Sequence, residues 1–214
     1  MGNIACVLFD LGGVIVNWHN SWLIQEISDE FQLPEEKVSK EFHKNLPEIS
    51  TGRINEKDFW HIIGKELKSK KLINLNDSLL DRIFRKRVSL NNSMIDFSKE
   101  LSQKGITVGI LSNTEFVTYS VVKDLTSLEH FEHKFLSYEI GHLKPEPEIY
   151  RHVIENIPFA KEELFFIDDL KSNVESARSE GIDSVRYSDF DELMKECHLR
   201  KILWFLKIKE TIMT

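Results

Sequence analysis

Residues 4–14 read Ile-Ala-Cys-Val-Leu-Phe-Asp-Leu-Gly-Gly-Val, and this stretch determines the fold class. Its first six residues form a continuous apolar run, which is typical of a strand buried on both faces in a parallel sheet. Asp10 ends the run, and Gly12 and Gly13 follow as at a tight turn. A carboxylate there is costly to bury unless it is paired or bound to a cation, so Asp10 is either a turn or cap residue or part of a site.

The same arrangement of an apolar run followed by polar residues occurs twice more. Ile106–Leu111 is followed by Ser112, Asn113 and Thr114, and Leu164–Ile167 is followed by Asp168 and Asp169. Weaker strand patterns lie at Ser184–Tyr187 and around Lys134–Leu136. Because parallel sheets bind ligands outside the carboxyl ends of their strands, we expect the three polar clusters to converge on one site.

Amphipathic segments separate the strands. Helices are predicted at Ser93–Lys104, Pro147–Asn156 and Asn173–Glu180, with Gly105 and Gly181 as stop signals. Strands that alternate with helices indicate an α/β fold. The predicted core is a Rossmann-like, three-layer arrangement around a parallel sheet.

Residues 17–92 have a different character. Their amphipathic patterns predict about four helices, at Trp22–Phe31, Glu35–His43, Asn55–Leu67 and Ser78–Val88, punctuated by Pro34, Pro47 and Gly52. We therefore expect a core domain of residues 1–16 and 93–214 and an inserted helical-bundle cap of residues 17–92. The segment Leu199–Ile208 predicts a final helix packed on the core.

Composition narrows the classes of partner. The chain has 214 residues and a net charge of −7, which argues against broad nucleic-acid binding. No run of ~18 apolar residues is present, so no membrane partner is expected. The two cysteines, Cys6 and Cys197, lack zinc-site spacing and suit a reducing compartment. We expect a cytoplasmic protein, either a monomer or a homodimer.

Adjacent carboxylates such as Asp168 and Asp169 repel each other unless a cation neutralises them. Oxygen-rich sites of this kind favour Mg²⁺, although one of the pair could instead cap the next helix. Ser112 with its neighbours could bind a phosphate or simply cap a helix. Lys144 precedes Pro145, which favours an extended backbone, and it could offset the carboxylates or be an ordinary solvated charge.

Taken together, four segments resemble the haloacid dehalogenase-like hydrolase superfamily. They are Phe9–Val14, Leu111–Thr114, Lys144-Pro145 and Phe166–Asp169, in the order and spacing of the family's four motifs. The inserted helices resemble the C1 cap of subfamily I. With glycine at position 12, directly after Asp10-Leu11, the sequence resembles the branch of the family typified by alpha-D-glucose-1-phosphate phosphatase.

The resemblance implies a magnesium-dependent phosphatase that acts on a small phosphorylated metabolite, with a sugar phosphate as one candidate. It implies that Asp10 is the nucleophile and forms an aspartyl-phosphate, with Lys144 and Ser112 as further catalytic residues. It also implies two ligand sets. Mg²⁺ would be held by Asp10, Gly12, Asp168 and Asp169, and the substrate by Gly13, Ser112, Asn113 and Lys144.

The sequence departs from the family at Gly12, where most family phosphatases have an aspartate as general acid and base. Such a group typically contributes ~10²–10⁴-fold in rate, so a substitute is expected, with His19 and His142 as candidates. Two alternatives remain: a 2-haloacid dehalogenase, and a non-catalytic phosphate-binding regulatory protein on the same fold. For the substrate-selecting surface of the cap, we expect Asn17, Trp18, His19 and Arg53.

Overall fold

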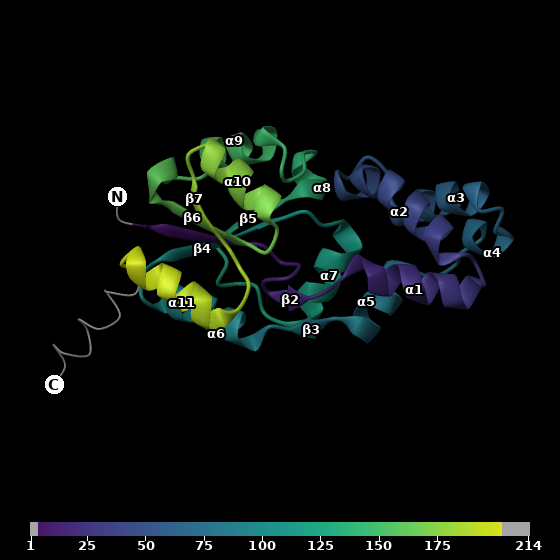
Figure 1. Cartoon of the computed structure of the whole chain (residues 1–214), viewed down its shortest axis with the longest axis horizontal. Coiled ribbons are helices and arrows are strands. Elements are labelled where there is room, and N and C mark those ends of the chain that lie inside the picture. Colours follow the sequence, from purple (N-terminus) through teal and green to yellow (C-terminus); the bar gives the residue numbers. More distant parts are fainter. Residues whose placement is uncertain (1–3, 203–214) are drawn as a thin grey trace.

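The computed structural model describes residues 4–202 and contains a five-stranded parallel sheet (Figure 1). The strand order is β5-β4-β1-β6-β7, and every neighbouring pair in this sheet is parallel. The strands are β1 (Cys6–Phe9), β4 (Thr107–Ser112), β5 (His133–Leu136), β6 (Leu164–Asp168) and β7 (Asp183–Arg186). All five strands expected from the sequence are present.

Helices cover both faces of this sheet, which confirms the three-layer α/β core. Val7 and Phe9 face a cluster built from α6 (Asn92–Gln103), α7 (Phe116–Leu125) and α11 (Phe190–Leu199). Cys6 and Leu8 face a second cluster built from α9 (Pro147–Asn156) and α10 (Lys171–Ser179). Figure 1 shows α9 and α10 on one side of the sheet and α6 and α11 on the other. Alternate residues of β1 therefore supply two separate cores.

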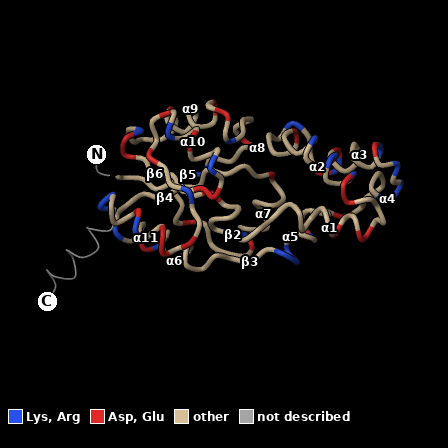
Figure 2. Tube along the Cα trace, in the orientation of Figure 1, with Lys and Arg blue, Asp and Glu red and all other residues tan. Residues whose placement is uncertain are grey.

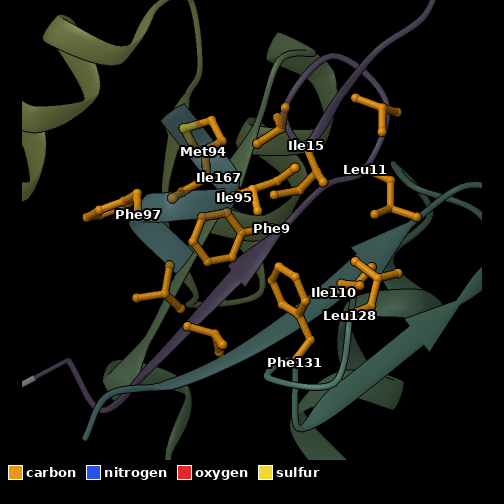
Figure 3. Close-up of a cluster of buried hydrophobic side chains, with 14 of the residues drawn as sticks. Phe9, Leu11, Ile15, Met94, Ile95, Phe97, Ile110, Leu128, Phe131 and Ile167 are labelled. Atoms are coloured by element: carbon orange, nitrogen blue, oxygen red, sulfur yellow. The ribbon is translucent and has the colours of Figure 1, made fainter. Parts of the chain in front are cut away.

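Phe9 lies at the centre of the first cluster (Figure 3). Its side chain is fully buried, and its ring makes edge-to-face contacts with Phe97 and Phe131 at centroid distances of 6.2 and 5.8 Å. Because Phe9 directly precedes Asp10, the packing that fixes this ring also fixes where the carboxylate begins.

The helical insertion between β1 and β4 contains α1 (Asn20–Phe31), α2 (Glu35–Ser50), α3 (Glu56–Glu66), α4 (Lys70–Ile73) and α5 (Leu79–Arg87). These helices enclose a hydrophobic cluster of their own, which includes Ile27, Phe59 and Ile63. Charges of both signs lie along the outer helices (Figure 2), and Glu26 of α1 pairs with Lys86 of α5. The four expected helices are confirmed, and α4 is an additional short one.

The expected break at Pro47 is wrong. Helix α2 does not end near His43 but continues through Pro47 to Ser50. Ile49 is buried and Leu46 packs against the insertion's cluster, so the apolar face of α2 continues past the proline. Tertiary packing therefore outweighs the hydrogen bond that the proline cannot donate.

Two short strands join the insertion to the rest of the chain. β2 (Val16–Asn17) pairs antiparallel with β3 (Ser89–Leu90), and the Asn17 side chain donates to Ser89 Oγ at 3.1 Å. The sequence pattern indicated no strand within residues 17–92, because two residues are too few to show alternation. This ladder lies at the expected boundaries, and the division into domains stays a prediction.

The remaining elements are α8 (Ser137–Ile140) and a 3₁₀ turn at Lys161–Glu163. Helix α11 ends at Leu199 and residues 200–202 form a turn, so the expected final helix does not begin at Leu199. Residues 203–208 of that expected helix lie outside the described residues. Within residues 4–202, Cys6 and Cys197 are buried and make no disulfide, and no helix is long and apolar enough to cross a membrane.

Replacing Phe9 with alanine is expected to lower the free energy of unfolding by about 3–5 kcal/mol, because it leaves a cavity beneath the site. Urea unfolding measures this change. Phe116→Ala is the matched control, since that ring is 66% exposed, and its effect should stay within about 0.5 kcal/mol. Equal losses in the two variants would contradict this description of the core.

Candidate active site

The three polar clusters meet at the carboxyl end of the sheet. Asp10 directly follows β1, while Ser112 and Asp168 are the last residues of β4 and β6. Since β1 lies between β4 and β6, Asp10 lies between the other two side chains. The convergence expected from the sequence is therefore present.

Lys144 connects these strand ends. It is 3% exposed, and its Nζ contacts Asp168 Oδ2 at 2.6 Å, Asp10 Oδ1 at 3.0 Å and the Leu111 carbonyl at 2.9 Å. An ammonium group has three N–H donors, and three oxygens surround this one. Lys144 is thus a buried ion-pair residue and not a solvated surface charge.

Asn113 holds the backbone of Lys144. Its Nδ2 donates to the Lys144 carbonyl at 2.7 Å, and its Oδ1 accepts from the Lys144 N–H at 2.8 Å. Both polar ends of the amide are therefore directed at one residue 31 positions away. A substrate contact by Asn113 stays a prediction, and its side chain already has this positioning contact.

Asp168 is fully buried and surrounded by donors. Its oxygens accept from the Leu170 N–H at 2.8 Å and from Asn173 Nδ2 at 3.0 Å, in addition to Lys144. Asn173 is held in turn by Tyr150, whose hydroxyl donates to the Asn173 carbonyl at 2.9 Å. The sequence analysis gave Asn173 no role beyond the start of a predicted helix, and in the structure it orients Asp168.

Asp169 is half-buried and lies against Gly13. A Cβ at Gly13 would collide with the Asp169 carboxylate, and Gly13 has a φ of 77°, which favours glycine. The Gly13 N–H donates to the Val16 carbonyl at 2.8 Å. Gly13 therefore makes room for Asp169, and its expected substrate contact stays a prediction.

Asp10, Asp168 and Asp169 form a compact group, with one oxygen from each lying within 4.8 Å of the others. Burial raises the pKa of Asp10 to about 7; the charge of Asp168 raises it too, while Lys144 and Ser112 lower it. Burial and then Asp168 also raise the pKa of Asp169. One lysine does not balance three carboxylates, and three hard oxygen ligands match a divalent cation such as Mg²⁺.

A cavity of about 450 Å³ opens in front of this group, between the strand ends and helices α1, α2, α5 and α7. Asp10, Gly12, Ser112, Asn113, Lys144 and Asp169 line it at the sheet. Among the expected selecting residues, Trp18 and His19 line it.

Other expectations for this surface are wrong. Asn17 bonds to Ser89 at the β2–β3 ladder, and Arg53 pairs with Glu48 at 3.1 Å, so neither lines the cavity. His142 lies 3.6 Å from Glu146 on the surface and is also absent from the lining. Of the two expected substitutes for an acid at position 12, only His19 reaches the cavity.

Glu115 lines the cavity, and the sequence analysis did not single it out. It precedes α7, and burial raises the pKa of its carboxyl to about 7. A signal was present, because Glu115 directly extends the polar cluster Ser112-Asn113-Thr114.

Comparison with known proteins agrees with this geometry. Rat bifunctional epoxide hydrolase 2 is 25% identical over 206 residues, which is 88% of this chain but only 37% of that protein. The D-ribitol-5-phosphate phosphatase of Bacteroides thetaiotaomicron is 24% identical, with 85% of this chain and 90% of that protein covered. The sesquiterpene phosphatase of Aspergillus oryzae is also 24% identical, with 85% and 89% covered.

A solved structure is similar along nearly its whole length. It is a haloacid dehalogenase family enzyme of Bacteroides thetaiotaomicron in complex with magnesium and inorganic phosphate. It has a TM-score of 0.75 and 27% identity, and the match covers 89% of this chain and 99% of that one. Residues 7–187 match the sequence model of the haloacid dehalogenase-like hydrolases, a span that includes all four motifs. The chain belongs to the haloacid dehalogenase-like hydrolase family.

Proposed function

We propose that this protein is a magnesium-dependent phosphatase that hydrolyses a small phosphate monoester through an aspartyl-phosphate on Asp10. The observation that carries the proposal is the Asp10 carboxylate, oriented by Lys144 and open to a cavity. Two relatives are named as phosphatases, and a similar solved structure holds magnesium and phosphate. One relative acts on a polyol phosphate by name and the other on a sesquiterpene, so relatives alone do not identify the substrate.

The residues fit a magnesium ion. The Asp168 carboxylate already accepts hydrogen bonds from other residues of the protein. Among residues 4–202, no other side chain donates a hydrogen bond to the Asp169 carboxylate, which belongs to the same group of three. Asp169, Asp10 and the Gly12 carbonyl would hold the ion, and Asp168 would support them. When bound, the ion neutralises negative charge on the phosphoryl oxygens.

Asp10 is the nucleophile in this proposal. Its Oδ1 accepts from the Leu11 N–H at 2.7 Å and from Lys144 at 3.0 Å, which leaves Oδ2 outside these contacts. Oδ2 attacks phosphorus, the bond from phosphorus to the ester oxygen breaks, and the ester oxygen takes a proton from a water molecule as the alcohol leaves. Ser112 and Lys144 offset charge on the phosphoryl oxygens.

Water completes the cycle. It attacks the phosphorus of the aspartyl-phosphate, the bond between phosphorus and Oδ2 breaks, and phosphate leaves with Asp10 restored as a carboxylate. This proposal is favoured over dehalogenation because the three carboxylates form a group that fits a divalent cation. Such a cation offsets the charge of a phosphate dianion, whereas displacement of a halide from a 2-haloacid does not need one.

Asp10→Asn is expected to lower kcat on p-nitrophenyl phosphate by about 10⁴–10⁶-fold, because the amide cannot replace the nucleophile. Steady-state assays with and without Mg²⁺ measure the loss. Acid-quenched wild-type enzyme should carry one covalent phosphate that Asp10→Asn lacks. Full activity in the variant, or in the wild type without a divalent cation, would exclude the mechanism.

Mg²⁺ at about 100 times its dissociation constant is expected to raise the free energy of unfolding by about 2.7 kcal/mol. Asp169→Asn should raise the dissociation constant for Mg²⁺ at least about tenfold. Since the pKa of Asp169 is raised in the folded protein, its ionised form destabilises the metal-free fold at neutral pH. The variant should therefore melt higher than wild type without Mg²⁺ and gain less from adding it.

Asp96→Asn is the matched control, because the Asp96 side chain is 78% exposed on α6. Its melting temperature should respond to Mg²⁺ as the wild type does. Thermal denaturation across a magnesium titration compares the three proteins, and an identical response of Asp169→Asn would place the ion elsewhere.

Gly12→Asp is expected to accelerate hydrolysis of alkyl phosphates by about 10²-fold or more, because it supplies the missing acid. Nothing lies within 4 Å of a Cβ at Gly12, so the cavity accommodates the side chain. The rate of p-nitrophenyl phosphate hydrolysis should increase much less, since nitrophenolate leaves without a proton. Gly12→Ala controls for the added Cβ, and an alanine effect equal to that of aspartate would reject the acid role.

A further inference from the structure

The cavity has two chemically different ends. At the sheet, charged and hydroxyl side chains line it, including Asp10, Ser112 and Lys144. At the helical insertion, most of the lining is hydrocarbon, from Leu23, Phe42, Leu46, Ile49, Leu80 and Phe84. His19, Asn20, His43 and Ser50 are the polar residues that line it there. The first end fits a phosphoryl group, and the second would contact whatever the phosphate is esterified to.

Ring packing holds the hydrocarbon end in place. Trp18, which also lines the cavity, packs on Phe84 with ring centroids 4.7 Å apart. Phe42 and Phe59 make an edge-to-face contact at 5.6 Å. Four of these side chains, Leu23, Phe42, Phe59 and Phe84, are at most 2% exposed. The wall is therefore preformed and does not depend on a ligand to organise it.

Two of the polar side chains on the insertion side, those of Asn20 and His43, have partners within the chain. Asn20 Oδ1 accepts from Trp18 Nε1 at 3.0 Å, and His43 Nδ1 lies 2.8 Å from the Ser39 carbonyl. Among the described residues that line the cavity, no lysine or arginine comes from the insertion. A sugar or polyol entering here would give up hydrogen bonds to water and find few replacements.

Glu115 provides an internal indicator of how dry this space is. Its carboxyl lines the cavity on the α7 side, and burial is the largest cause that raises its pKa to about 7. The backbone N–H groups of Glu115 and Thr118 lower this pKa, and the charge of Glu56 raises it. No cation is among the causes that lower it, so this part of the cavity does not favour a second anionic group.

We propose that the substrates are phosphate monoesters whose organic group is a hydrocarbon, an alkyl or isoprenoid-like chain, and not a sugar or polyol. This inference rests on the proposed function and specifies its substrate class. The cavity of about 450 Å³ lies within the range of roughly 300–1,000 Å³ typical of small-molecule sites, so a chain of several carbons fits. The phosphate lies at the strand ends, and the chain extends between α1, α2 and α5.

Chain length is the variable that tests the proposal. Burial of one methylene contributes enough to change kcat/KM about fourfold. For n-alkyl phosphates from ethyl to octyl, kcat/KM should therefore rise steeply with chain length until the cavity is filled. The kcat/KM values for hexose 6-phosphates and glycerol phosphate should be at least about 100-fold lower than that for octyl phosphate. A flat series, or a polyol phosphate that surpasses octyl phosphate, would overturn the proposal.

Variants locate the effect at the hydrocarbon wall. Leu46 lines the cavity and is only half-buried, so Leu46→Gln should fold and should reduce the octyl-to-ethyl ratio of kcat/KM about tenfold. Ile62→Gln is the matched control, because Ile62 is 37% exposed on α3 and does not line the cavity. The octyl-to-ethyl ratio of kcat/KM for Ile62→Gln should equal that of the wild type. Equal ratios in both variants would mean that the alkyl chain of the substrate binds elsewhere.

Binding separates failure of this proposal from failure of the proposed function. Calorimetry with Asp10→Asn compares octyl phosphate, glucose 6-phosphate and inorganic phosphate in the presence of Mg²⁺. Preferential binding of octyl phosphate without turnover by wild type would reject the phosphatase and keep the ligand class. Hydrolysis of p-nitrophenyl phosphate with preferential binding of glucose 6-phosphate would keep the phosphatase and reject the ligand class.

Discussion

The buried ammonium group of Lys144 is the contact on which the site depends. It lies within 3.0 Å of one oxygen each of Asp10, Asp168 and Leu111, and these three residues come from the ends of three adjacent strands. Two carboxylates this close would repel in a desolvated pocket, and burial of Asp10 already favours its protonated form. The lysine keeps them together, so the geometry of the three strand ends follows from one charge.

That charge has its own supports, which come from distant parts of the chain. Asn113 fixes the backbone of Lys144 on one side. On the other, Tyr150 holds Asn173, which orients Asp168. Asp10 is thus the last member of a chain of neutral and charged contacts. Removing one partner of a buried ion pair is costlier than removing the whole pair, which explains why such a group must be complete to be stable.

Sequence reasoning predicted the strand ends well because their signal is local. An apolar run followed by Asp10, Ser112 or Asp168 is visible in a few residues, and the parallel topology then brings the runs together. The supports were harder to predict. Asn113 and Lys144 are 31 positions apart, and nothing in either short stretch encodes their pairing. The same holds for Pro47, where packing of Ile49 and Leu46 kept α2 helical against a local stop signal.

The cavity wall was the least predictable part. An amphipathic pattern in the insertion identifies buried positions but does not distinguish those that face the insertion's own core from those that face a ligand. Leu23 and Phe42 do both, since they belong to the insertion's hydrophobic cluster and also line the cavity. Arg53 was expected on this surface, but it pairs with Glu48 and does not line the cavity.

The two-residue ladder between β2 and β3 lies at the boundary between two groups of cavity residues. All the carboxylates and the lysine of the site lie outside residues 17–90, while most of the hydrocarbon wall lies within them. If the protein has the proposed function, substitutions between the two strands would change which organic group is accepted without disturbing the strand ends. The residues proposed to determine selectivity and those proposed to determine reactivity would then be encoded in separate stretches of the chain.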